Sequence, residues 1–206
     1  QIALAKTFKD GDFRAGYYRD QTFMTAIGQY SPKHMFSALY GDPELEREPS
    51  SGSRQMMNHF GTRFLNDDGS WKNLMNQKNS TSDMACLASQ FPRLVGLAQA
   101  SQVYRRNKKL AEKKSTFTNN GSEIAFATIG NSSCAEGHFW EAVNAIGVLQ
   151  VPAIISIWDD GYGISVSNEV QMTKSDVSEV LAGFQRDKKN AGFEIIKVKG
   201  WDYPSL

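Results

Sequence analysis

One stretch of the chain, residues 123–165, restricts the possible folds more than any other. Its first run, Glu123–Ile129, is short, apolar and partly β-branched, which favours a buried strand over a helix segment. Residues 135–149 then carry apolar side chains at helical spacing, and Pro152 ends that pattern. A second apolar run, Ala153–Trp158, completes a strand–helix–strand unit. In such units the strands are normally parallel and the crossover right-handed.

Polar residues follow both predicted strands. Gly130, Asn131 and Ser132 come after the first strand, and residues 159–162, Asp-Asp-Gly-Tyr, come after the second. Ligands of parallel sheets bind beyond the carboxyl ends of the strands, and neighbouring strands lie about 4.8 Å apart. Mg²⁺ would take a carboxylate, an amide oxygen and a backbone carbonyl here, leaving its other positions to phosphate and water. A phosphate-binding loop without a metal is the alternative.

This spacing resembles the thiamin diphosphate motif, in which Gly-Asp-Gly follows one strand and Asn follows the next. The string AEGHFWEAVNAIGVLQVPAIISIWDDGYGIS, residues 135–165, is similar to the α part of the decarboxylating component of 2-oxo acid dehydrogenases, of the pyruvate and branched-chain type. The resemblance implies an α/β fold with a doubly wound parallel sheet, the thiamin diphosphate-binding fold. It also implies that Asn131, Asp160 and the backbone carbonyl of Tyr162 hold Mg²⁺ on the cofactor diphosphate.

The chain departs from the family pattern at both side-chain ligands. Asn131 stands where the family has Asp, and Asp160 where the family has Asn. One carboxylate and one amide oxygen are still available, so Asn131→Asp combined with Asp160→Asn is expected to recover much of the binding that Asp160→Asn alone would lose. Gly130, Ser132 and Glu136 are further candidate cofactor contacts, and Glu136 is favoured in the first helical turn by the helix dipole.

Two other segments resemble cofactor-binding parts of this family. Tyr18-Arg19 matches a pair that reaches the diphosphate, and the planar fork of Arg suits two phosphate oxygens. On its own, Arg19 would be interpreted as a surface ion-pair partner. Leu87 lies in a segment that supports the cofactor rings, and the resemblance implies a contact partly through its backbone. Ser89 and Gln90 match the ligands of a K⁺ found in some relatives, although the residues before them differ from the family pattern.

Residues 42–82 form the least regular part of the sequence, and long loops of this kind are usually functional or disordered. Within it, Ser53–Phe60 resembles the family's Gly-Arg-Gln-Met segment followed by His. His59 is therefore the candidate for proton transfer or charge stabilisation, and Arg54 for an anion contact.

The remaining patterns predict the other elements. Residues 1–40 are expected to be helical with breaks, and residues 83–114 to form a long helical run with Pro92 in the first turn of its main helix. A helix over residues 176–186, capped by Ser175, and a third strand over residues 193–198 complete the pattern.

Composition supports one water-soluble domain, and we expect residues 1–206 to be a single module of a longer polypeptide. The chain has 23 basic and 22 acidic residues and is 40% hydrophobic. A net charge of +1 gives no general case for nucleic acid, and no apolar run approaches the ~18 residues of a membrane span. The basic cluster in residues 105–114 suits a solvated helix end, with nucleic acid or acidic lipid as the alternative. Two cysteines favour a reducing compartment, the cytoplasm or the mitochondrial matrix.

The resemblance implies a function as well as a fold. It implies oxidative decarboxylation of pyruvate or a branched-chain 2-oxo acid, with acyl transfer to the lipoyl group of a partner acyltransferase. In the family, the Glu that activates the cofactor comes from a β subunit or a fused β domain, so this chain alone is expected to be inactive. The alternatives are a transketolase-like thiamin diphosphate enzyme and a non-catalytic assembly subunit with a degraded metal site.

Overall fold

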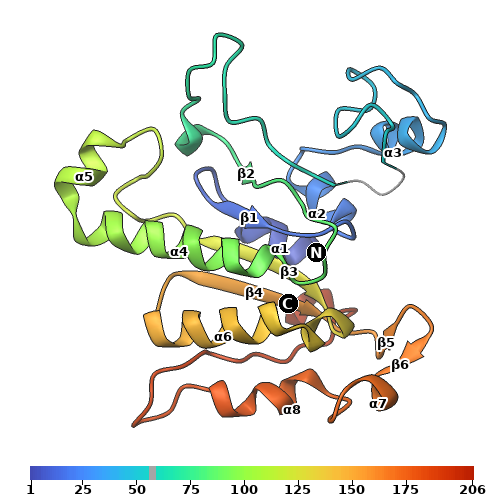
Figure 1. Ribbon diagram of the computed structural model, residues 1–206, viewed down its shortest axis with the longest axis vertical. Helices are drawn as coiled ribbons and strands as arrows, with labels where there is room; N and C mark the ends of the chain where they lie inside the picture. Colours follow the sequence, from blue (N-terminus) through green and yellow to red (C-terminus); the bar gives the residue numbers. More distant parts are fainter. Residues whose placement is uncertain (56–58) are drawn as a thin grey trace.

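A parallel β-sheet forms the centre of the protein (Figure 1). The structure is a computed structural model that describes residues 1–55 and 59–206. The four strands of the central sheet follow the spatial order β2-β1-β3-β4. They are β1 (Phe13–Ala15), β2 (Asn79–Ser80), β3 (Ala125–Gly130) and β4 (Ala153–Trp158). The predicted strand–helix–strand unit is confirmed, since β3 and β4 pair in parallel from Ala125↔Ala153 to Gly130↔Trp158.

Helices and a small hairpin surround this sheet. The hairpin pairs β5 (Tyr162–Gly163) with β6 (Val166–Ser167) in antiparallel fashion. The α-helices are α1 (Ile2–Thr7), α2 (Gln21–Ala26), α3 (Pro32–Leu39), α4 (Gln90–Arg106), α5 (Lys108–Lys113), α6 (Gly137–Leu149), α7 (Asn168–Gln171) and α8 (Val177–Leu181). Short 3₁₀ turns are η1 (Leu74–Asn76), η2 (Ser132–Ala135), η3 (Ala182–Phe184) and η4 (Tyr203–Ser205).

Both faces of the sheet are covered, as a doubly wound fold requires. Successive side chains of a strand point to opposite faces, and β3 shows this alternation clearly. Ala127 and Ile129 join the apolar cluster formed with α4 and α6, whereas Phe126 joins Phe8 and Phe23 on the side of α1 and α2. Full burial of a side chain such as Phe126 contributes roughly 1.5–3 kcal/mol. Figure 1 shows α4 and α6 running along one side of the sheet.

The sequence-based expectations for the first 82 residues were partly wrong. β1 lies inside the segment predicted to be helical, and β2 lies in the segment predicted to be irregular. A strand of three residues or fewer is too short to show a period of two, and β1 carries a charged residue, Arg14, at its centre. In contrast, Pro92 lies in the first turn of α4 as expected.

The predicted third strand over residues 193–198 is also wrong. Only Phe193 makes a β-bridge, and it does so with Gln185. The Phe193 amide donates to Phe184 O at 2.8 Å, and the Arg186 amide donates to Phe193 O at 2.8 Å. The backbone around Phe193 is therefore paired with the end of η3, and it does not extend the sheet at β4.

Two predicted helix starts shift by one or two residues. Asp176, and not Ser175, caps α8, because its carboxylate accepts the Ser178 amide at 2.8 Å. Glu136 occupies the N-cap position of α6 and so precedes the first turn in which it was expected. In the described parts of the chain, no helix combines the length and the apolar character needed to cross a membrane.

Candidate functional site

The order of the strands locates the candidate site. The chain passes from β1 outward to β2 on one side and then returns to β3 on the other side of β1. The loops after β1 and β3 therefore diverge, and ligands of such sheets bind at this point, beyond the carboxyl ends of the strands. A small hollow opens there, at the start of α4. Its lining residues come from three segments: Tyr17, Tyr18, Met84, Ala85, Cys86, Leu87, Ala88, Gln90, Ile129 and Ser133.

Two of the predicted cofactor contacts, Tyr18 and Leu87, meet in this hollow. Tyr17, which the sequence did not single out, packs with ring centroids 5.8 Å from Trp158 and 5.6 Å from Tyr18. A Cβ atom at Gly130 would lie 3.6 Å from the Tyr17 hydroxyl, so β3 ends directly against this ring. Burial raises the pKa of Tyr17, and the Asp20 carboxylate adds to the effect. The Tyr17 phenol therefore stays neutral at physiological pH.

Arg19 lies at the exposed rim of the hollow. Its Nε donates to Tyr18 Oη at 3.0 Å, and its guanidinium carbon is 5.5 Å from the centre of the Tyr18 ring. The hydrogen bond that Arg19 donates to the Tyr18 hydroxyl is the main reason why the pKa of Arg19 is raised. An exposed guanidinium that is anchored through Nε can pair with a phosphate group through its other nitrogens.

The ends of β3 and β4 bring two of the three predicted metal ligands into contact. Asn131 is 2% exposed, and its amide nitrogen donates to the Tyr162 carbonyl at 3.2 Å. Its backbone amide donates to Trp158 O at 3.2 Å, which fixes the position of Asn131 relative to β4. Asp160 is exposed in the same turn, where its Oδ1 accepts the Tyr162 amide at 3.0 Å.

The oxygen donors of these residues are of the types that a Mg²⁺ ion shared with a diphosphate would require. An amide side chain, a carboxylate and a backbone carbonyl are hard oxygen donors, and they leave positions open for phosphate oxygens. Burial raises the pKa of Tyr17 and the hydrogen bond to Tyr18 raises the pKa of Arg19, and the negative charge of Asp160 adds a smaller effect to both. A metal bound without phosphate would need a cluster of three or more His, Cys, Asp or Glu side chains. The described residues contain no such cluster.

The structure also reveals a residue of this site that the sequence did not indicate. Asn168, the first residue of α7, is 4% exposed and lies against Asn131. Its Oδ1 accepts from the Asn131 amide nitrogen at 2.7 Å. No spacing or motif marks Asn168, because its partner lies 37 positions away in the sequence.

Two other predicted contacts from this loop lie beside the hollow. The Ser132 hydroxyl accepts a hydrogen bond from the side-chain amide of Gln171, and Ser133, not Ser132, lines the hollow. Glu136 is exposed at the N-cap of α6, where its side chain makes no capping hydrogen bond. Both stay predictions as cofactor contacts.

Of the Ser53–Phe60 segment, Met56–Asn58 lies outside the described residues. Arg54 is exposed and its Nη1 donates to Ser51 O at 2.8 Å, away from the residues that line the hollow. Ser53, at the position where the family has Gly, adopts a left-handed backbone with φ of 58°. Its hydroxyl donates to Asp42 O at 2.6 Å, which offsets part of the strain. His59 is half-buried and directly precedes Phe60, whose amide donates to Asp83 Oδ2 at 3.0 Å.

A buried ion cluster lies beneath the hollow and connects its walls. Arg14 is fully buried, donates through Nε to Asp20 at 2.7 Å, and meets Asp83 as well. Thr128 of β3 donates to the same Asp20 oxygen at 2.6 Å. Burial raises the pKa of Asp20, and the negative charge of Asp83 adds to this effect, although Arg14 and Thr128 act in the opposite direction. The cluster thus joins β1, β3 and the segment before α4.

The predicted K⁺ ligands make hydrogen bonds to backbone carbonyl groups. The Ser89 hydroxyl donates to Cys86 O at 2.7 Å, and the buried Gln90 side chain donates to Thr128 O at 2.9 Å. K⁺ binding stays a prediction.

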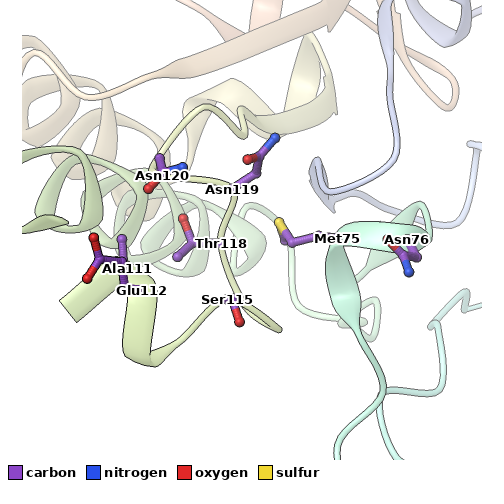
Figure 2. Close-up of a pocket in the computed structure, with 8 residues that line it drawn as sticks. All are labelled: Met75, Asn76, Ala111, Glu112, Ser115, Thr118, Asn119 and Asn120. Atoms are coloured by element: carbon purple, nitrogen blue, oxygen red, sulfur yellow. The ribbon is translucent and has the colours of Figure 1, made fainter. Parts of the chain in front are cut away.

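A larger hollow of about 530 Å³ lies at the other end of the sheet. Figure 2 shows Met75 and Asn76 on one side of it and residues from Ala111 to Asn120 on the other. These segments lead into the amino ends of β2 and β3, whereas ligands of parallel sheets bind at the carboxyl ends. None of the predicted site residues lines this hollow.

Comparison with known proteins identifies the family of this chain. The profile of the family described as "Dehydrogenase E1 component" matches residues 1–202. The chain belongs to this family. The E1 match confirms the resemblance identified from the sequence, and E1 components generally use thiamin diphosphate.

A curated relative is the "2-oxoisovalerate dehydrogenase subunit alpha" of Bacillus subtilis (strain 168). It is 28% identical over 176 residues, which cover 85% of this chain. The match covers 44% of that subunit, so this E1 chain spans less than half of its relative's length.

Proposed function

We propose that this chain is the diphosphate-binding module of a thiamin diphosphate-dependent 2-oxo acid dehydrogenase. The observation that carries the proposal is the contact between the buried Asn131 side chain and the Tyr162 carbonyl. This contact lies at the carboxyl ends of β3 and β4, next to the hollow that Tyr18 and Leu87 line.

Each predicted residue has a role in this proposal. Asn131, Asp160 and the Tyr162 carbonyl hold Mg²⁺, and Tyr18 and Arg19 bind the diphosphate from the opposite wall. Thiamin diphosphate supplies the carbanion chemistry at its thiazolium ring, and the protein binds and orients it. Leu87 supports the rings and Gly130 allows close approach of the backbone. Ser132, Glu136 and Arg54 are proposed as outer contacts.

His59 is the proposed proton-transfer residue. Its segment is held by the bond between the Phe60 amide and Asp83, and Asp83 is held in turn by Arg14. These bonds fix the backbone next to His59 relative to the hollow, and a positioned imidazole can hold or deliver a proton near neutral pH.

The reaction is proposed to be oxidative decarboxylation of a small 2-oxo acid with acyl transfer to a lipoyl group on a partner acyltransferase. The name of the Bacillus subtilis relative supports a branched-chain 2-oxo acid over pyruvate. A β subunit or a fused β domain supplies the cofactor-activating Glu, so residues 1–206 alone are expected to show no turnover. Cytoplasm, or the mitochondrial matrix in a eukaryote, is the expected compartment.

Calorimetric titration of the full-length protein tests this proposal. Thiamin diphosphate should bind in the presence of Mg²⁺ and bind much more weakly when EDTA is present, because the ion bridges protein and diphosphate. Absence of binding in both conditions would contradict the proposal and support an assembly subunit with a degraded site. Binding combined with ketol transfer, and no turnover of 2-oxo acids, would support a transketolase-like enzyme.

A further inference from the structure

The orientation of the Asn168 side chain is set by two groups that can only accept hydrogen bonds. Its Nδ2 lies 2.9 Å from the Ser175 carbonyl and 3.3 Å from a carboxylate oxygen of Asp159. A carbonyl and an ionised carboxylate both need a donor, so the Asn168 nitrogen faces them. The Asn168 oxygen must then face the opposite way, towards Asn131. Its backbone amide, which donates to Gly161 O at 2.9 Å, holds the residue in place.

This orientation in turn determines what position 131 can present. The two groups that face the Asn131 nitrogen are Asn168 Oδ1 at 2.7 Å and the Tyr162 carbonyl at 3.2 Å. Both are acceptors, so position 131 must supply a donor on this side. Asn supplies the donor with its nitrogen and keeps its oxygen at the other end of the planar amide group. A carboxylate would place an oxygen against two acceptors in a buried environment, which is costly.

We propose that Asn168 is the positioning residue that makes position 131 an amide in this chain and that aims the Asn131 oxygen away from the Asn168 oxygen. Asn168 therefore accounts for the Asn131 half of the exchange between Asn131 and Asp160. The consequence for Mg²⁺, that this oxygen is the one offered to the ion, rests on the proposed function. Figure 1 shows the elements involved, with the β5–β6 hairpin and α7 beside the end of β3.

The test changes the donor pattern at both positions in the full-length protein. Asn131→Asp removes the donor, and Asn168→Thr adds a hydroxyl that can donate to the new carboxylate, directly or through one water. Asn168→Val has nearly the same shape as Asn168→Thr and no hydroxyl, so it is the matched control. The set comprises the wild type, the three single variants and the two double variants. The first measurement is the melting temperature without any ligand.

Asn131→Asp is expected to lower the melting temperature by ~3–10 °C, because a buried acceptor is left unpaired. Asn131→Asp with Asn168→Thr should recover at least half of this loss, whereas the combination with Asn168→Val should not. Equal melting temperatures of the two double variants, or a wild-type melting temperature for Asn131→Asp, would overturn the positioning role.

The second measurement is Mn²⁺ binding, followed by electron paramagnetic resonance with thiamin diphosphate present. The double variant with Asn168→Thr should bind Mn²⁺ about 10–100-fold more tightly than the one with Asn168→Val, as expected when a partner orients a ligand. If the melting temperatures follow the expected pattern and no protein binds Mn²⁺, wild type included, then the positioning role is supported and the proposed function is contradicted.

Discussion

Arg14 and Asp83 are joined by two parallel hydrogen bonds, Nη1 to Oδ1 at 2.9 Å and Nη2 to Oδ2 at 3.0 Å. Both side chains are fully buried, although the residues are 69 positions apart. The same guanidinium also binds Asp20, the Ser80 hydroxyl and the Tyr17 carbonyl. A buried charge is tolerated only when it is paired and fully hydrogen-bonded, so this cluster depends on every member.

The first prediction therefore concerns Arg14. Arg14→Met should lower the free energy of unfolding by about 3–5 kcal/mol, because it leaves two carboxylates buried without their cation. Arg14→Lys should also destabilise, since an ammonium group cannot reproduce the planar fork. Urea unfolding measures both. Arg47→Met is the control, because Arg47 makes a similar two-point contact with Asp42 on the surface, and little change is expected there. Equal effects at the two arginines would contradict the assigned role of burial.

The second prediction concerns the close approach of the backbone to this cluster. A Cβ atom at Gly16 would collide with the guanidinium of Arg14 and a carboxylate oxygen of Asp20. Gly16→Ala should therefore destabilise by about 1–3 kcal/mol. Gly96→Ala is the matched control, since no atom lies within 4 Å of its added methyl group in α4, and the exchange should stabilise by about 0.5–1 kcal/mol. The two variants should change the free energy of unfolding, measured with urea, in opposite directions. A stabilising Gly16→Ala would show that Arg14 and Asp20 can move to accommodate the methyl group.

The third prediction concerns Asp160. Asp160→Asn removes the carboxylate of the proposed metal site and should weaken Mg²⁺-dependent binding of thiamin diphosphate by at least about 10–100-fold. That is the loss typical when a residue that only hydrogen-bonds to a metal ligand is removed, and loss of a ligand should cost no less. Calorimetric titration of the full-length protein measures it. Asp67→Asn is the control, because Asp67 is 91% exposed and pairs only with Arg63 in the described structure. Unchanged binding in Asp160→Asn would remove this residue from the metal site.

The fourth prediction concerns His59. His59→Ala in the complete enzyme should lower the turnover of 2-oxo acid or the acylation of lipoyl by ~10²–10⁴-fold, as is typical when a general acid or base is lost. The melting temperature should change little if the imidazole serves the reaction. His138→Ala, at an exposed position on α6, should alter neither quantity. A large fall in the melting temperature with a normal turnover would assign His59 to the fold.

The fifth prediction is a pH dependence at the start of α8. Lys197 and then Ser178 stabilise the Asp176 carboxylate and lower its pKa from 3.8 to about 2. A carboxylate with a lowered folded-state pKa stabilises the protein above the unfolded-state value, and this contribution is lost as pH falls towards the folded-state value. Asp176→Asn keeps the cap and removes the charge. Its difference in urea midpoint from the wild type should be constant from pH 7 to pH 5 and shrink between about pH 4 and pH 2.

Lys197→Met should reproduce the same loss of pH dependence, because Lys197 is the largest cause of the lowered pKa. A difference that grows as pH falls would have the wrong sign and would contradict the ion pair.

The local patterns of the sequence predicted most of the β3–α6–β4 unit. β4 matches its predicted range, and α6 begins two residues later than expected. Both could be predicted because the apolar period of α6 and the position of Pro152 are properties of residues that are close in the sequence. β1 was missed because Arg14 at its centre is typical of a surface, and its burial depends on a cluster that includes Asp83, far along the chain.

The candidate site shows the same limit. Asn131 and Tyr162 could be paired from the sequence because each follows a recognisable strand. Asn168 could not, since its hydrogen bonds to Asn131, Asp159 and Ser175 exist only after the hairpin folds back. The sequence alone therefore suggested that the double exchange of Asn131 and Asp160 would restore binding. With Asn168 present, we expect that exchange to fail without a third change.

The sequence separation between the paired strands of the sheet also affects the order in which they form. β3 pairs with β4 from Ala125↔Ala153, across a helix, whereas β1 pairs with β3 from Phe13↔Ala125, across 112 residues. The second loop is four times longer, so closing it costs about 1.2 kcal/mol more in chain entropy. The β3–α6–β4 unit is therefore expected to form first and β1 to dock later. The boundary between β1 and β3, at whose carboxyl end the hollow with Tyr18 and Leu87 opens, is thus expected to be completed late in folding.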